Sequence, residues 1–491
     1  MRTLALLLPI ALVRAALTPL PSRAPAAGGP SSCPAPGDPL CPLSTQEYIT
    51  VAHDGFREHA LRIRETTGWC DPDVRSWTGY LDINGGSKHL FFYFFESRCA
   101  PSTDPLLMYV DGGPGCSGAL GLFMELGPCS VNVQGTDTVP RSAAWNERVN
   151  VIFLDQPVGA GWSHADYEQV VDTTEAAAVD VVAFVRLFLE RFQQYKGREF
   201  HMTGKSYAGR YLPVFAGEIL DQNKRAAAQG MQEINLKSIM IGNGHTDYFT
   251  MLPSRFELVC TGASVPPILD VSQCVRMKRA LPRCLQMTRA SCVDRFDELG
   301  CKAAKGFCSE QLEDPFVASG RNIYDISKEC EGSIGETLCY PITTKITDYL
   351  NLPSTRNLLG VDDGVSSFEL CANKVWKAFN GRMDIHAPNT YYVANLLERG
   401  ISILNFAGTY DWACNWIGNM RWVEEMEWSG REAYNAQPAR QWFVDGQPAG
   451  ITKSWKGMTF ATIDGAGHLA PHDKPVQALA LANRWLAKRA L

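Results

Sequence analysis

Long apolar stretches are missing from most of this sequence. After an N-terminal run at residues 4–13, no segment approaches about 18 uninterrupted apolar residues, the length that a membrane-spanning helix needs. Cys-x-x-Cys pairs are also missing, and the histidines do not cluster near the cysteines, which disfavours a structural zinc site. No Asn-x-Ser/Thr site occurs, so N-glycosylation is not expected. We therefore expect a soluble protein without a membrane partner.

An excess of positive charge is missing too, since the formal net charge is -6. Nucleic acids and anionic membranes are bound through clusters of Lys and Arg, so neither is an expected partner, and peptides or small molecules are favoured. His468 and His472 have the spacing of metal ligands on one helix turn, but Pro471 between them disfavours that helix. We predict no metal and no cofactor. The sequence leaves the oligomeric state open.

Cysteine, in contrast, is abundant, with 16 residues. Residues 1–16 have the charged start, apolar run and small residues of a secretory signal peptide, although a short buried helix is an alternative. Exported proteins mature in an oxidising compartment, so the cysteines are expected to form disulfides. We predict a protein of the secretory pathway, secreted or vacuolar, with a Pro-, Ala-, Gly- and Ser-rich arm or pro-segment at residues 17–45.

Short apolar runs alternate with helix-like stretches along most of the chain. The helix-like stretches cover 174–192, 207–222 and 475–490. The apolar runs have the length and unbroken hydrophobicity of strands buried on both faces, and they are 106–110, 151–154, 200–203, 236–241, 401–406 and 458–463. This alternation predicts an α/β fold with a mainly parallel central sheet covered on both sides.

Residues 248–370 interrupt the alternation. Eight cysteines lie here, at Cys260, Cys274, Cys284, Cys292, Cys301, Cys308, Cys330 and Cys339. We interpret this interval as a disulfide-stapled helical cap inserted between two parts of one core, residues 46–247 and 371–491. Such a cap would overhang the carboxyl ends of the strands, where α/β proteins bind ligands.

Ser206 is the candidate nucleophile. Gly204 and Ala208 flank it at two residues' distance, between a predicted strand and a predicted helix. A nucleophile elbow needs small residues there, because its sharp turn brings the two backbones together while exposing the Ser hydroxyl. Taken alone, the motif also fits a Gly-rich turn with an incidental Ser.

A candidate base and a candidate acid follow downstream. Asp411 comes just after the run 401–406, and His468 just after the run 458–463. A Ser hydroxyl needs a base, and the base needs an orienting carboxylate. Either residue alone would be an ordinary turn residue, but the order Ser, Asp, His on loops after strands predicts the triad of an α/β-hydrolase.

An oxyanion formed at Ser206 would need two hydrogen-bond donors. We expect them from the backbone N–H groups of Tyr207 and of Gly113, in the Gly112-Gly113 loop after the run 106–110. A phosphate-binding loop is the alternative for this Gly-rich segment, but the segment lacks the Lys-Ser/Thr ending of such loops.

Taken together, these segments resemble the serine carboxypeptidases from about Cys70 to the C-terminus. Residues 111–117, Asp-Gly-Gly-Pro-Gly-Cys-Ser, are similar to that family's Asn-Gly-Gly-Pro-Gly-Cys-Ser segment. Further similar blocks follow in order at 145–146, 155–163, 408–416 and 467–475. The resemblance implies an α/β-hydrolase fold and the release of single residues from peptide or protein C-termini through an acyl-enzyme, without a metal.

The resemblance to fungal vacuolar-type members also implies a disulfide pattern. The implied pairs are Cys116–Cys371, Cys260–Cys274, Cys284–Cys308, Cys292–Cys301 and Cys330–Cys339. Cys414 is similar to the family's free thiol beside the active site. The resemblance assigns no partner to Cys33, Cys41, Cys70, Cys99 and Cys129.

The segment that holds the substrate's terminal carboxylate departs from the family. The family uses an Asn followed by Gly, a Glu in a Glu-Leu-Gly-Pro segment, and a Glu before the nucleophile; the residues here are Asp111 with Gly112, Glu125, and Lys205. Three carboxylates, the substrate's included, would face one Lys, so a bound proton is still needed. We expect an exopeptidase favoured by acid, with Asp111 and Lys205 as a paired replacement; a damaged site is the alternative.

Two other functions fit the same scaffold. An acyltransferase would pass the acyl group to an alcohol instead of water, and an inactive binding homologue could follow from the altered carboxylate site. The presence of Ser206, Asp411 and His468 favours a catalyst.

Overall fold

The computed structural model describes residues 48–52, 57–166, 169–228, 231–387 and 389–491. The predicted signal peptide at 1–16 and the predicted arm at 17–45 lie outside these residues. The described residues belong to one compact unit, Gln46–Leu491. Within the described ranges, no helix combines the length and apolar character needed to cross a membrane.

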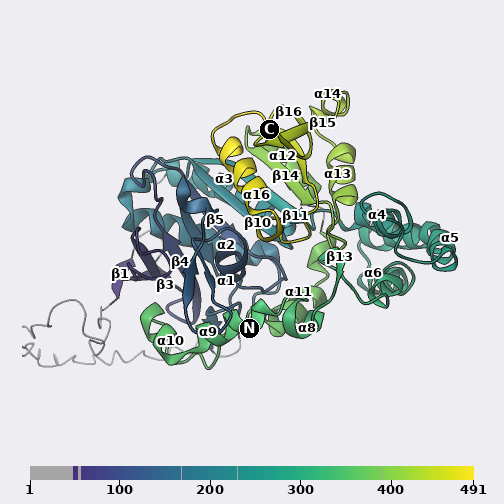
Figure 1. Cartoon of the computed structure of the whole chain (residues 1–491). Coiled ribbons are helices and arrows are strands. Elements are labelled where there is room, and N and C mark those ends of the chain that lie inside the picture. The colour runs from purple at the N-terminus through teal and green to yellow at the C-terminus, as the bar shows by residue number, and fades with distance from the viewer. Residues whose placement is uncertain (1–47, 53–56, 167–168, 229–230, 388) are drawn as a thin grey trace, which may run out of the picture. The chain divides into compact units, whose positions relative to one another are not determined.

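A large sheet forms the centre of this unit (Figure 1). Its strand order is β1-β2-β3-β4-β8-β5-β10-β11-β14-β17-β16-β15, and β9 pairs with β4. The strand bounds are β1 (Ile49–Ala52), β2 (His59–Glu65), β3 (Ser76–Ile83), β4 (Lys88–Phe95), β5 (Leu106–Val110), β8 (Asn150–Leu154), β9 (His164–Ala165), β10 (Phe200–Ser206), β11 (Leu236–Gly244), β14 (Ser402–Gly408), β15 (Arg440–Val444), β16 (Gln447–Trp455) and β17 (Met458–Ile463). Two small sheets pair β6 (Cys129–Val131) with β7 (Thr138–Pro140) and β12 (Arg321–Asn322) with β13 (Asp325–Glu329).

The six neighbouring strands β8, β5, β10, β11, β14 and β17 are parallel, and the strands on both flanks are antiparallel. These six strands are the ones formed by the six apolar runs of the sequence. The prediction of a mainly parallel α/β sheet is therefore confirmed.

Helices cover both faces of the sheet. They are α1 (Gly118–Leu120), α2 (Thr174–Arg191), α3 (Ala208–Ala228), α4 (Tyr248–Cys260), α5 (Val271–Thr288), α6 (Glu298–Cys308), α7 (Asp314–Val317), α8 (Ile334–Thr337), α9 (Ile342–Asn351), α10 (Pro353–Leu359), α11 (Asn373–Gly381), α12 (Thr390–Glu398), α13 (Trp416–Glu425), α14 (Arg431–Asn435), α15 (Ala470–Asp473) and α16 (Pro475–Leu486), with a π-helical turn η2 at Gly121–Glu125.

Side chains of β5 point alternately into two hydrophobic cores. Leu106, Met108 and Val110 belong to the core that includes residues of α2, α3 and α12. Leu107 and Tyr109 belong to the core that includes residues of η2, α9 and α16. Because both faces of β5 are covered, the strand is apolar along its whole length and shows no alternation with polar residues.

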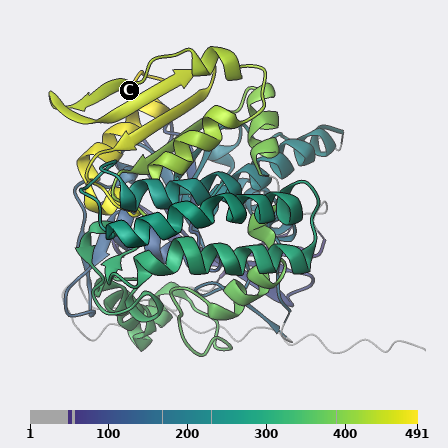
Figure 2. The ribbon, with the colours of Figure 1, turned by 90° about the vertical axis from the view of Figure 1, so that its right-hand side faces the viewer.

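Residues 248–370 are mainly helical. Helices α4, α5 and α6 lie side by side (Figure 2). Leu252 and Leu281 belong to a hydrophobic core that also includes Phe316 of α7 and Trp412 from the following part of the chain. The neighbouring strands β11 and β14 come before and after this interval in the chain. On this basis we propose that it is an insertion between core parts 46–247 and 371–491.

Six disulfides are present in the described residues. Five have the pairs that the family resemblance implies, Cys116–Cys371, Cys260–Cys274, Cys284–Cys308, Cys292–Cys301 and Cys330–Cys339. The sixth joins Cys70 to Cys129, two cysteines to which the family resemblance assigns no partner. Cys414 is buried and Cys99 is exposed, both as thiols. Cys33 and Cys41 lie outside the described residues.

Candidate active site

Ser206 ends β10 and lies just before α3. Its φ of +60° is a left-handed value that non-glycine residues adopt uncommonly. A Cβ added to Gly204 would lie 2.2 Å from the carbonyl oxygen of Val110, and one added to Gly112 would lie 2.7 Å from Ser206 Cβ. These close approaches explain why small residues surround the turn, which holds Ser206 at the carboxyl end of a central parallel strand.

His468 and Asp411 meet beside Ser206. His468 Nδ1 lies 2.8 Å from Asp411 Oδ2, and both side chains are buried. Since a carboxylate accepts, Nδ1 carries the proton and Nε2 is left with its lone pair. Asp411 Oδ2 also accepts from Asn243 Nδ2 at 2.8 Å and from the Cys414 N–H at 3.1 Å, which fixes the carboxylate.

Ser206 and His468 line one cavity of about 60 Å³. Gly113 lines it as well, and a Cβ on the preceding Gly112 would lie 2.6 Å from the backbone nitrogen of Tyr207. The two residues predicted to donate to an oxyanion, Gly113 and Tyr207, are therefore next to Ser206. The remaining lining residues are Asp111, Cys116, Leu120, Met124, Lys205, Tyr324, Leu338, Tyr340, Thr343 and Leu469.

Asp155 anchors the loop that carries Gly113. Its Oδ1 accepts from the Ser117 hydroxyl at 2.5 Å and from the Gly118 N–H at 2.8 Å, and its Oδ2 accepts from the Trp162 N–H at 2.9 Å. Burial raises the pKa of Asp155 to about 7, against the effect of these hydrogen bonds. The sequence showed Asp155 only as part of a family-like block, because its partners are brought together by folding.

Lys205 lines the same cavity as Ser206 and lies in a buried cluster of charges. Its Nζ is 2.8 Å from Asp111 Oδ1, 2.9 Å from Asp111 Oδ2 and 3.1 Å from Glu125 Oε1. The Tyr109 hydroxyl donates to Asp111 Oδ2 at 2.7 Å, and Glu125 Oε1 lies 3.0 Å from the same hydroxyl oxygen. The sequence does not predict a role for Tyr109 in this cluster, because the residue lies in an apolar strand and resembles a core residue.

The charges of this cluster are set by burial and by one another. Burial opposes the charge of Lys205, but Asp111 and Glu125 outweigh it and raise the pKa of the ammonium group. Burial also raises the pKa of Glu125, although Lys205 acts in the opposite direction. Lys205 is therefore a cation, and the carboxyl group of Glu125 keeps its proton to a higher pH than an ordinary carboxyl does.

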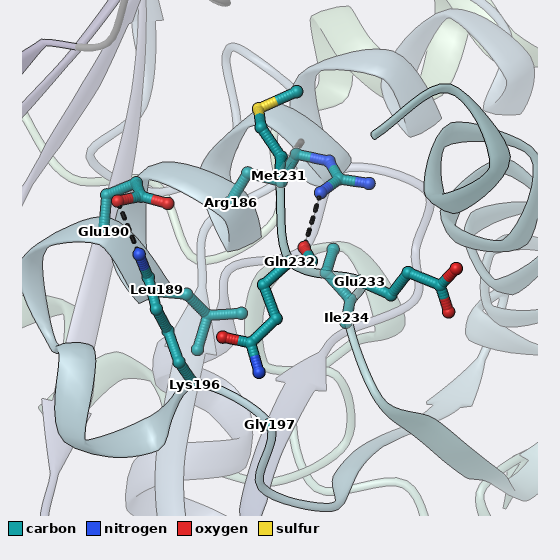
Figure 3. A pocket seen from close by; sticks show the side chains of 9 residues that line it. All are labelled: Arg186, Leu189, Glu190, Lys196, Gly197, Met231, Gln232, Glu233 and Ile234. Carbon is teal, nitrogen blue, oxygen red and sulfur yellow. Dashed lines mark hydrogen bonds and ion pairs between the residues drawn. The ribbon is translucent and has the colours of Figure 1, made fainter. Parts of the chain in front are cut away.

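The small pocket of Figure 3 lies at the opposite end of β10. It is lined by Arg186, Leu189, Glu190, Lys196, Gly197, Met231, Gln232, Glu233 and Ile234. Glu190 and Lys196 form an ion pair at 2.7 Å, and Arg186 Nη1 donates to the Gln232 carbonyl at 3.3 Å. Since β10 starts at Phe200 and ends at Ser206, this pocket takes no part in chemistry at the triad.

Comparisons with known proteins match most of this chain to one family. The family model of the serine carboxypeptidases matches residues 68–488. Carboxypeptidase Y of Candida albicans is 39% identical over 447 residues, which are 91% of this chain and 80% of that protein. Carboxypeptidase Y homolog A of Aspergillus niger is 41% identical over 442 residues, 88% of this chain and 76% of that protein.

A solved structure supports the fold. The prohormone-processing carboxypeptidase KEX1(delta)p of Saccharomyces cerevisiae matches with a TM-score of 0.73 and 22% identity, over 85% of this chain and 92% of that one. Together with the sheet order, this likeness confirms the predicted fold class.

Proposed function

This chain belongs to the serine carboxypeptidase family, and we propose that Ser206, His468 and Asp411 carry out its reaction, the release of C-terminal amino acids from peptides. The observation that carries the proposal is the 2.8 Å contact of His468 Nδ1 with Asp411, beside a cavity that His468 shares with Ser206. The enzyme is a serine-type hydrolase, and the proposed reaction uses these three side chains and no metal ion.

The first step forms the acyl-enzyme. His468 Nε2 takes the proton of the Ser206 hydroxyl while Oγ bonds to the carbonyl carbon of the last peptide bond. The carbonyl oxygen becomes an oxyanion, which the N–H groups of Gly113 and Tyr207 stabilise. When the C–N bond breaks, the imidazolium of His468 gives its proton to the departing amine.

The second step releases the shortened peptide. A water molecule takes the place of the departed amino acid, His468 removes one of its protons, and the hydroxide attacks the ester carbon. The C–O bond to Ser206 then breaks, and Oγ regains a proton from His468. Asp411 keeps its charge throughout and stabilises the imidazolium.

Selection of a free C-terminus is assigned to the charged cluster around Lys205, together with the Gly112 backbone. Asp111 contacts Lys205 twice and Glu125 lies 3.1 Å from the same ammonium nitrogen, so the substrate's carboxylate would bring a third negative charge to one cation. A protonated Glu125 would donate a hydrogen bond to that carboxylate, whereas an ionised one would repel it. This supports an acidic optimum, because the pKa of Glu125 is raised by burial.

Mass spectrometry of a peptide during digestion across pH tests the function and the selectivity together. We expect a ladder that loses one C-terminal residue per step, with the free-acid peptide preferred over its amide and the preference greatest in acid. Equal kcat/KM for the two peptides at every pH contradicts the role of the cluster. Acyl transfer to an added alcohol, without release of amino acids from a peptide, would favour an acyltransferase.

We also propose that the protein matures in the secretory pathway and acts in a vacuole or outside the cell. The disulfides support this location, because such bonds persist in oxidising compartments and are rare in the cytosol. Fractionation of cells with an antibody against the protein tests it, and a purely cytosolic signal overturns it.

A further inference from the structure

Two histidines and an aspartate meet at the sheet, apart from the triad. His89 in β4 and His164 in β9 are directly paired across the two strands, and their rings stack with centroids 4.4 Å apart. Asp362 follows α10 in the chain. Each of the three residues offers a metal-ligating atom, and these atoms lie within 4.8 Å of one another.

Hydrogen bonds set the tautomers of both histidines. His89 Nδ1 lies 2.6 Å from Asp82 Oδ1, and His164 Nδ1 lies 3.4 Å from the Trp162 carbonyl oxygen. A carboxylate and a carbonyl only accept, so each Nδ1 carries the hydrogen. In the neutral rings, each Nε2 is then left with a lone pair, which is the atom that commonly binds metals.

The carboxylate completes a set of electron-pair donors. Asp362 Oδ2 lies 3.7 Å from His164 Nε2. Arg62 donates to Asp362 at 2.8 Å through both terminal nitrogens, and it also donates to Asp82 at 2.7 and 2.8 Å. Two carboxylates thus share one guanidinium, and these three side chains leave one negative charge next to two imidazole lone pairs.

We propose that His89, His164 and Asp362 bind a divalent transition-metal ion of the zinc class. Two imidazole nitrogens and a carboxylate oxygen are a ligand set that Zn²⁺ accepts, with water in the open position. Bonds of about 2.0–2.2 Å require the three atoms to approach one another and the nearly parallel rings to turn. Asp82 has the place of the carboxylate that orients a metal-binding histidine through its other nitrogen.

The described residues contain two other groups of side chains that could bind a metal, and both have another role. Cys292 and Cys301, near His386, form a disulfide and have no thiolate to offer. Asp411, Cys414 and His468 belong to the candidate active site. An ion at His89, His164 and Asp362 would link β4 and β9 to the segment that contains Asp362. That segment continues to Cys371, which forms a disulfide with Cys116 in the loop beside Ser206. The expected effect of the ion is on stability, since it touches no reacting atom.

Calorimetric titration of the chelator-treated enzyme with Zn²⁺ at pH 7.5 tests the site, with Mg²⁺ as a comparison ion. We expect one Zn²⁺ to bind, Mg²⁺ not to bind, and Tm to rise by on the order of a few degrees when zinc is in large excess over Kd. His164→Gln should weaken zinc binding at least tenfold, and Asp82→Asn by about 10- to 100-fold. His59→Gln, on strand β2, which β3 separates from β4, is the matched control and should bind zinc as the wild type does.

Labelling of Ser206 by an organophosphate shows whether each variant is folded. Absence of zinc binding to the wild type overturns the proposal, as does unchanged binding to a folded His164→Gln variant. Zinc binding that is lost when Ser206 is labelled would assign the ion to the active site and would also overturn it.

Discussion

The hydroxyl of Tyr207 donates a 2.8 Å hydrogen bond to Asp384 Oδ2, which joins the residue after Ser206 to a distant part of the chain. The same buried carboxylate accepts from the Thr174 hydroxyl at 2.6 Å, the Thr174 N–H at 3.0 Å and Arg210 at 3.4 Å. Asp384 therefore connects the starts of α2 and α3 next to the turn of Ser206. We infer that it is a positioning residue for the Tyr207 N–H.

Asp384→Asn should lower kcat by about 10- to 100-fold with little change in KM, because a small shift of a preorganised donor costs transition-state stabilisation. An amide cannot accept from all of these donors. Steady-state kinetics on one peptide measures kcat and KM separately. Tyr207→Phe keeps the backbone N–H donor, so its kcat should fall less than that of Asp384→Asn. A rise in KM at unchanged kcat would contradict the positioning role.

Ser206→Ala should lower kcat by on the order of 10⁶-fold and abolish labelling by an organophosphate, because it removes the hydroxyl from which His468 is proposed to take a proton. Ser87→Ala, between β3 and β4 and not among the residues that line the cavity of Ser206, is the matched control and should keep full labelling. Labelling of Ser206→Ala at the same rate as the wild type would show that a different residue is the nucleophile.

Glu125→Gln should flatten the pH dependence of KM for peptides with a free C-terminus. Burial raises the pKa of Glu125, so the wild-type carboxyl keeps its proton in acid and loses it as pH rises through that value. Binding of the substrate carboxylate to the wild-type enzyme should weaken over the same pH range. The side-chain amide of the Glu125→Gln variant can donate a hydrogen bond at every pH. KM for the amidated peptide serves as the control and should change little with pH in either enzyme.

Lys205→Met should destabilise the fold by about 3–5 kcal/mol at pH 8, because it leaves two buried carboxylates without their cation. The loss should be smaller at pH 5, because burial raises the pKa of Glu125 and this carboxyl holds its proton more readily in acid. Urea unfolding at both pH values measures the difference, with the exposed Lys237→Met as the control. An equal loss at both pH values would mean that packing, and not charge, is the cause.

The raised pKa of Glu125 also affects the wild-type protein. Above the ordinary carboxyl value of 4.5, the unfolded chain releases a proton that the folded protein still holds. The free energy of unfolding should therefore fall as pH rises from there through the raised pKa. Glu125→Gln should remove this part of the pH dependence in the same urea experiment.

Buried strands could be predicted because nothing polar interrupts them, as in β5 and β17, where every residue is buried. The pair β15 and β16 escaped prediction. In β15, exposed and buried residues are mixed, and Arg440, Gln441 and Phe443 are exposed, so no apolar run marks the strand. Edge strands of this kind take their place from their neighbours, which the sequence pattern does not reveal.

Candidate site residues could be picked out where they end or follow a strand, as Ser206, Asp411 and His468 do. The altered charges at Asp111 and Lys205 were visible as well, because their positions match a family motif. Asp384 carries no such signal: it lies 177 residues from Tyr207 in the chain and contacts it only after folding. In its local sequence, Asp384 has the appearance of an ordinary turn residue.

Strand β5 has a practical consequence for refolding. Met108 and Val110 enter one core, while Tyr109 enters the other and reaches Asp111 and Glu125. A slip of β5 by one residue would exchange the two faces, burying the wrong side chains and removing the phenol from the acid pair. Carboxypeptidase activity regained after dilution from denaturant would therefore count the molecules in which the centre of the sheet has reassembled in register, and it could serve as a quality test for recombinant batches.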